Sequence, residues 1–148
     1  MLRPRRGRCR GCLGTHVLLP QLAFSRRQDE VAVIGSAIEA KVVAGEGFRP
    51  IAARLGAYPE TVRGWLRRFA LRAEALRAHF TRCAVVLDPE LGAVLPAGSD
   101  IADALEAIAI TARAWVLRFG PAEPWEIASR LSGGLLLGNT NRPLESVM

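Results

Sequence analysis

The chain has 148 residues, with almost no lysine, few aromatic side chains and no acidic residue near its start. Of its basic residues, Lys41 is the one lysine and the others are all arginine. The first acid is Asp29, so residues 1–28 carry seven arginines with no negative charge. A GC-rich bacterial genome accounts for arginine in place of lysine. It does not account for the clustering of the arginines along the chain.

Long uncharged hydrophobic runs are also missing. A transmembrane helix needs about 18 apolar residues in succession, and the sequence contains no such run. The apolar stretch over residues 13–24 is interrupted by polar residues and by Pro20, so we do not expect a signal peptide. The three cysteines are an odd number and form no disulfide framework. Together these absences predict a protein of the reducing cytoplasm, with no membrane partner.

The sequence also lacks catalytic motifs. His16 and His79 have no motif partner for nucleophilic catalysis, and no glycine-rich loop is followed by Lys-Ser or Lys-Thr. The acids fall on expected exposed helix faces or caps, without the set of strand-borne carboxylates that a metal-dependent nuclease requires. We therefore predict that the chain is not an enzyme.

The sequence is rich in hydrophobic residues, and its positive charge is concentrated in particular segments. Hydrophobic residues make up 50%, which is enough for a packed core. Residues 49–82 contain eight arginines against Glu60 and Glu74, whereas residues 100–148 contain six acids and four arginines. Basic charge gathered in one segment predicts contact with nucleic-acid phosphates.

The segment over residues 49–69 has the pattern of a helix-turn-helix. A short helix over residues 50–55 is followed by Gly56, which adopts a left-handed turn at low steric cost. Pro59 is well placed in the first turn of a second helix, where its missing N–H is no loss. An apolar stripe then recurs at helical spacing and faces inward: Val62, Trp65, Leu66 and Phe69.

The opposite face of that second helix is typical of a helix that enters the major groove of DNA. Arg63 and Arg67 are spaced to reach guanine edges, and Gly64 permits a close approach of the backbone. A glycine inside a helix costs about 1 kcal/mol relative to alanine, so a close approach would explain its presence. The alternatives are a helical hairpin with no role in DNA binding, and a glycine without function on a solvated face. The predicted DNA-binding residues are Arg49, Arg54, Glu60, Thr61, Arg63, Gly64, Arg67, Arg68 and Arg72, of which Arg49, Arg54, Arg68 and Arg72 are expected at phosphates.

Further helices are expected on both sides of this segment. A helical pattern begins at Asp29 and ends before Gly45. This helix completes a three-helix unit with the two helices of the helix-turn-helix. Two apolar seams follow, over residues 66–83 and 101–119, joined by a Pro- and Gly-rich segment in which Ser99 is a candidate N-cap. They predict an antiparallel helical hairpin, although the first seam could instead form a homodimer. A short helix over residues 122–131 is expected to pack Trp125, Ile127 and Leu131 inward.

These elements predict a mainly α fold: a three-helix helix-turn-helix unit followed by a helical hairpin, with a short irregular or β N-terminal arm. The expected boundaries are a basic arm over residues 1–28, a DNA-binding domain over 29–82, a helical region over 83–138 and a tail over 139–148.

Cys9 and Cys12 form a C-x2-C knuckle, the arrangement that holds one half of a tetrahedral zinc site. The sequence contains no second C-x2-C. His79 and Cys83 lie at i and i+4 and could complete a site. We instead expect Cys83 in the apolar seam, where a free cysteine behaves as a small hydrophobe, and His79 as a solvated helix residue. Zinc is therefore a candidate cofactor with an incomplete set of ligands.

Four stretches give the chain a resemblance to a family of small actinobacterial, transposase-like proteins. They are Arg-Cys-Arg-Gly-Cys-Leu-Gly-Thr-His-Val-Leu-Leu-Pro (residues 8–20), Ile-Ala-Ala-Arg-Leu-Gly (51–56), Thr-Val-Arg-Gly-Trp-Leu-Arg-Arg (61–68) and Ser-Gly-Gly-Leu-Leu-Leu (132–137). The resemblance implies a zinc ribbon, a helix-turn-helix and a helical C-terminal region. In that family a further cysteine pair precedes the one at Cys9, so we expect either a start annotated too late or a truncated gene.

Two classes of function follow. The first is a non-catalytic protein that binds double-stranded DNA, either a transcriptional regulator or a transposase-related component, with residues 59–69 in the major groove. The second is a protein-interaction module that uses the C-terminal helical hairpin, which could be a truncated relic of a mobile element.

Overall fold

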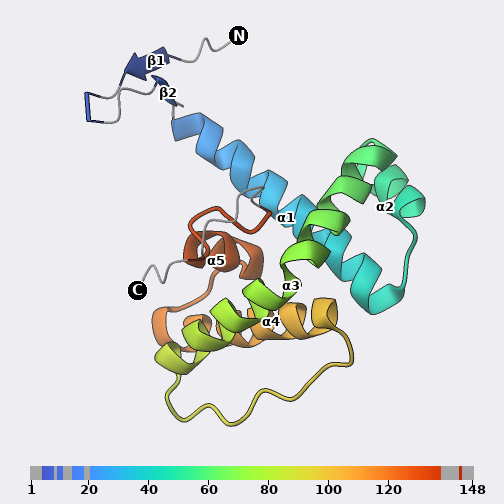
Figure 1. Cartoon of the computed structure of the whole chain (residues 1–148), viewed down its shortest axis with the longest axis vertical. Coiled ribbons are helices and arrows are strands. Elements are labelled where there is room, and N and C mark those ends of the chain that lie inside the picture. Colours follow the sequence, from blue (N-terminus) through green and yellow to red (C-terminus); the bar gives the residue numbers. More distant parts are fainter. Residues whose placement is uncertain (1–4, 9, 12–14, 19–20, 138–143, 145–148) are drawn as a thin grey trace. The chain divides into compact units, whose positions relative to one another are not determined.

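The computed structural model describes residues 5–8, 10–11, 15–18, 21–137 and 144 (Figure 1). The chain divides into two units, residues 1–30 and 31–148. In the first unit, strands β1 (Arg5–Arg8) and β2 (Thr15–Leu18) pair antiparallel, with Arg5 opposite Leu18. Both strands lie within the segment that the sequence predicted as a short irregular or β arm.

The fold is mainly α, as predicted, with five helices in the described residues. None of these helices is both long and apolar enough to cross a membrane. The first helix begins at Gln21 rather than at Asp29, and the predicted boundary after residue 82 falls inside a continuous helix. The helices are α1 (Gln21–Ala44), α2 (Phe48–Leu55), α3 (Pro59–Leu87), α4 (Asp100–Phe119) and α5 (Pro124–Leu131).

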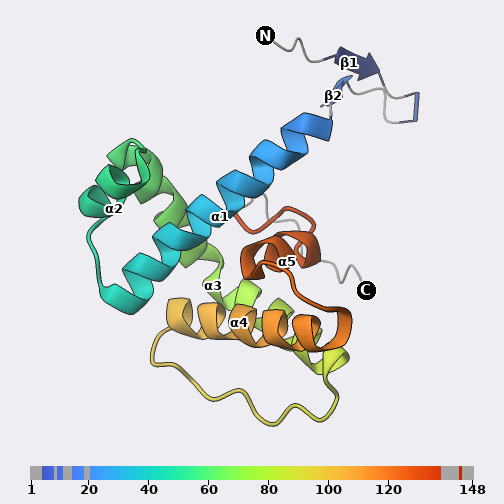
Figure 2. The same ribbon diagram turned by 180° about the vertical axis from the view of Figure 1, so that it is seen from behind.

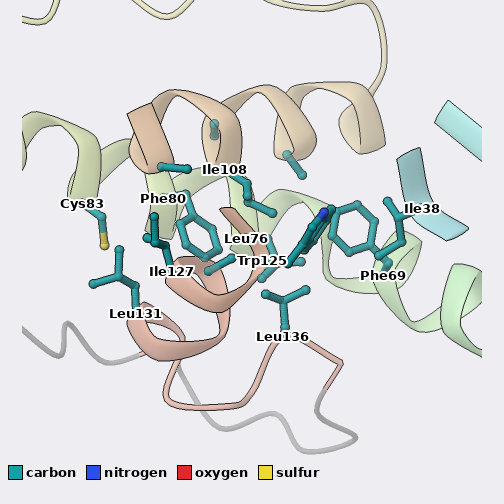
Figure 3. Packing of buried hydrophobic residues seen from close by; sticks show 14 of the residues in the cluster. Ile38, Phe69, Leu76, Phe80, Cys83, Ile108, Trp125, Ile127, Leu131 and Leu136 are labelled. Atoms are coloured by element: carbon teal, nitrogen blue, oxygen red, sulfur yellow. The ribbon is translucent and has the colours of Figure 1, made fainter. Parts of the chain in front are cut away.

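The main hydrophobic core of residues 31–148 lies between α3, α4 and α5. Phe69, Leu76 and Phe80 of α3 are at most 1% exposed, because the seam predicted over residues 66–83 packs inside the chain. Figure 3 shows Phe69 beside Trp125 at one end of the cluster and Cys83 near Leu131 at the other. The seam that the sequence offered for a homodimer is therefore largely covered by the chain itself.

Helices α3 and α4 run in the same direction, which corrects the predicted antiparallel hairpin. The Arg118 guanidinium near the end of α4 lies 3.4 Å from the carbonyl oxygens of Val86 and Leu87 at the end of α3. Residues 88–99 return along the helices from the end of α3 to the start of α4 (Figures 1 and 2). An extended chain covers about 3.3 Å per residue, so this segment is long enough for the roughly 30 Å of α4.

Small side chains and one hydroxyl group allow this parallel contact. Ala104 and Ala107 of α4 are fully buried, which lets the two helices approach closely. The Thr111 hydroxyl of α4 donates a hydrogen bond to the carbonyl oxygen of Phe80 on α3, at 2.7 Å. The predicted N-cap is confirmed, since the Ser99 side chain accepts from the N–H of Ala102.

Helix α5 is fixed by its tryptophan. As predicted, Trp125, Ile127 and Leu131 are buried. The Trp125 indole N–H donates to the Glu39 carboxylate at 2.7 Å, and its ring lies against the backbone of Gly35 on α1. A Cβ at residue 35 would overlap that ring, so Gly35 provides the space in which α5 packs. The predicted tail lies outside the described residues except for Leu144, which packs against the main core.

His79 is fully buried, so the expectation of a solvated histidine was wrong. Its Nε2–H donates to the carbonyl oxygen of Leu131, the last residue of α5, at 2.9 Å. The last carbonyls of a helix have no partner within the helix, and a histidine side chain can satisfy one of them. His79 lies three residues after Leu76 and four before Cys83, so its position on the buried face was visible in the sequence.

Candidate nucleic-acid interface

The turn between α2 and α3 forms as the sequence predicted. Gly56 adopts φ 63°, the left-handed conformation that favours glycine. The N–H of Ala57 bonds to the carbonyl of Ala52, and that of Gly56 to the carbonyl of Ala53. This pattern is a Schellman motif, which satisfies carbonyls that the end of α2 would otherwise leave unpaired. Pro59 then occupies the first turn of α3.

A second, smaller core holds α1, α2 and α3 together at this turn. It consists of Ala37 of α1, Ile51 and Ala52 of α2, and Val62 of α3, all with no exposed surface. Trp65 is only partly buried and packs at the edge of this core. Because the core fixes which face of α3 points inward, it also fixes which face remains open.

The open face of α3 carries the residues expected to contact bases. Glu60, Arg63 and Arg67 are exposed, and together with the half-buried Gly64 they line a shallow hollow. The Arg63 guanidinium lies 3.7 Å from the Glu60 carboxylate, and both side chains are mostly exposed. The ion pair is therefore weak, and a stronger acceptor such as a phosphate or a base can replace Glu60. Within the described part of the chain, Arg67 forms no ion pair. The hollow is therefore a basic, sterically open surface on the first turns of a helix.

Comparisons with known protein families, with curated proteins and with solved structures give no match to this chain. The geometry of the chain itself therefore carries the functional argument.

Further arginines flank the open face. Arg49 and Arg68 are exposed, and the Arg49 guanidinium lies 5.8 Å from the centre of the Phe48 ring. Arg54 is exposed and lies 3.4 Å from a carboxylate oxygen of Glu46. Glu46 was not among the predicted site residues, because the contact crosses the connection between α1 and α2. Thr61 is exposed as expected, whereas Arg72 is half-buried.

Gly64 is not required by the packing of the described residues. A Cβ there would meet the Arg68 guanidinium at 3.6 Å, an ordinary contact distance, and φ at Gly64 is not positive. We expect Gly64→Ala to raise the free energy of unfolding by about 0.5–1 kcal/mol, because alanine is the better helix former. Urea unfolding followed by helical circular dichroism measures this change. A loss of stability would show that the position is not open.

A zinc site is not completed by the described residues. Cys9 and Cys12 lie outside them, and the described residues contain no cluster of three or more potential metal ligands. Cys83 lies in the apolar core as predicted, where burial raises the pKa of its thiol. His79 Nε2 is 3.6 Å from the Cys83 sulfur and bonds to the carbonyl of Leu131, so both side chains lie within the packed core.

Proposed function

We propose that the chain is a non-catalytic protein that binds double-stranded DNA through a helix-turn-helix formed by α2 and α3. The observation that carries the proposal is the open face of α3, where Arg63, Gly64 and Arg67 line one hollow above a tightly packed turn. In a helix-turn-helix, the first residues of the second helix contact base edges while the first helix crosses the phosphate backbone.

Each side chain then has a defined role. Arg63 and Arg67 read guanine edges in the major groove, where a guanidinium can donate two hydrogen bonds to one base. Gly64 lies between them and lets the helix approach the DNA without a side chain in the way. Phosphate contacts come from the exposed arginines on the flanks, Arg49, Arg54 and Arg68, with Arg72 at the edge. Such contacts position the protein, whereas base contacts select the sequence.

A transcriptional regulator or a transposase-related component in the cytoplasm would use this surface in the same way. The resemblance to transposase-like proteins favours the second. The two roles differ in the DNA recognised, an operator in one case and the end of a mobile element in the other.

Salt dependence of binding tests the proposal directly. Four phosphate contacts per chain predict an affinity for a randomised duplex that falls about 150-fold between about 50 and 200 mM salt. Fluorescence anisotropy with a labelled duplex measures it, with a single strand of the same sequence as the control. Absence of binding at the lower salt, by a chain that circular dichroism shows to be helical, would contradict the proposal.

A further inference from the structure

The exposed side of α4 carries an apolar groove that DNA binding does not use. The groove has a volume of about 370 Å³, and its walls include Leu105 and Val116 of α4 and Trp125 of α5. Leu117 also lines it, and this side chain is 81% exposed. In Figure 2, α4 lies between α5 and the 88–99 segment, with α3 behind it. The exposed Leu117 side chain and the apolar groove therefore lie on one surface.

Two opposite charges lie on the same side of α4. Glu106 and Arg113 are exposed and seven residues apart, so they share a face but are separated by about 10 Å along the helix. In the region that the structure describes, neither side chain has an ion-pair partner. Ala109 lies between them and is also exposed, which leaves a small residue at the middle of the stripe.

We propose that this face of α4 binds a second copy of the same chain in a symmetric dimer. A two-fold interface uses the same patch on both subunits, so it must be complementary to itself. A patch that carries both signs of charge at positions symmetric about its centre, among exposed apolar side chains, meets this condition. An unrelated partner would not require the two charges to be placed symmetrically. The seam over residues 66–83, the other candidate for dimerisation, is mostly buried inside the chain.

The positions along α4 specify how the two copies meet. When two identical helices pack antiparallel about a two-fold axis, each residue faces a partner residue on the other side of the axis. The residue numbers of every facing pair therefore add up to the same value. With the axis beside Ala109, Glu106 faces Arg113 of the partner subunit, and by symmetry the reverse pair also forms. In the same register Leu117 faces Ala102 of the partner subunit, where a large side chain meets a small one. The same sum places Ala109 opposite Ile110 of the partner subunit at the crossing, where a small side chain again meets a large one.

Charge reversal with rescue tests this arrangement in the full chain. Sedimentation velocity across a wide range of concentration should show a dimer of the native chain. Glu106→Arg alone and Arg113→Glu alone should each weaken dimerisation roughly tenfold or more, because each places like charges opposite one another twice. The double variant carrying both reversals should dimerise as the native chain does, since the pairs are restored with exchanged signs.

The controls separate the interface from the fold and from DNA binding. Leu117→Asp should also give monomers, while its helical circular dichroism stays unchanged because residue 117 is exposed. Arg63→Ala/Arg67→Ala should remain dimeric, so loss of DNA binding and loss of the dimer are distinguishable. A native chain that is monomeric at every concentration, single reversals that leave the dimer intact, or a double reversal without rescue would each overturn the proposal.

Discussion

Replacement of both Arg63 and Arg67 by alanine should remove selective DNA binding and leave the fold unchanged. Both side chains are exposed and line the hollow on α3, so their loss creates no cavity. A bidentate arginine–guanine contact contributes about 1–3 kcal/mol of discrimination, so loss of two should lower affinity for a selected site at least thirtyfold. The selected site is first obtained by enriching a randomised duplex pool on the native chain.

Matched variants separate base reading from charge. Arg54→Ala should weaken binding to the selected site and to a scrambled duplex by similar factors, because a phosphate contact carries no sequence information. The control Arg82→Ala/Arg130→Ala removes two positive charges, as Arg63→Ala/Arg67→Ala does, but from exposed positions outside the hollow. It should leave the ratio between the two duplexes unchanged. Equal losses on both duplexes for Arg63→Ala/Arg67→Ala would contradict the roles assigned to these arginines.

The second large effect is expected in the core. Trp125→Ala should lower the free energy of unfolding by about 3–5 kcal/mol, because it empties the space between α5 and Gly35. It also removes the hydrogen bond from the indole N–H to Glu39. Urea unfolding measures the loss, and Leu95→Ala, at a side chain that is 77% exposed, is the control that should change stability by less than about 0.5 kcal/mol.

A double-variant cycle isolates the contact between Gly35 and Trp125. Gly35→Ala should destabilise the native chain by about 1–3 kcal/mol, because the new methyl group overlaps the Trp125 ring. In the Trp125→Ala background the overlap is gone, and the same substitution should become neutral or stabilising. An equal cost in both backgrounds would show that the ring does not pack on Gly35.

The sequence predicted well those features that depend on neighbouring residues. Gly56 and Pro59 indicate the turn and the start of α3 because their backbone preferences are local. Ser99 is recognisable as an N-cap for the same reason. The inward side of α3 also follows from its periodicity, and its opposite side contains Glu60, Arg63, Gly64 and Arg67 as a group.

The sequence could not give the relations between distant elements. A three-four repeat of apolar residues looks the same whether two helices run parallel or antiparallel, so the direction of α4 depends on the path of residues 88–99. The role of Gly35 depends on Trp125, ninety residues later in the chain. The spacing of His79 from Leu76 and Cys83 indicates that it lies on the buried face of α3. Its hydrogen-bond acceptor belongs to α5, however, and only the folded chain brings the two together.

The most direct test of DNA binding by α3 is the affinity of Gly64→Ala for the selected duplex, measured beside its stability. The account predicts that the variant unfolds at a higher urea concentration than the native chain and yet binds the duplex more weakly. Higher stability with reduced affinity would mean that the glycine is retained for a close approach to DNA. Higher stability with unchanged affinity would contradict the proposal that this face of α3 enters the major groove.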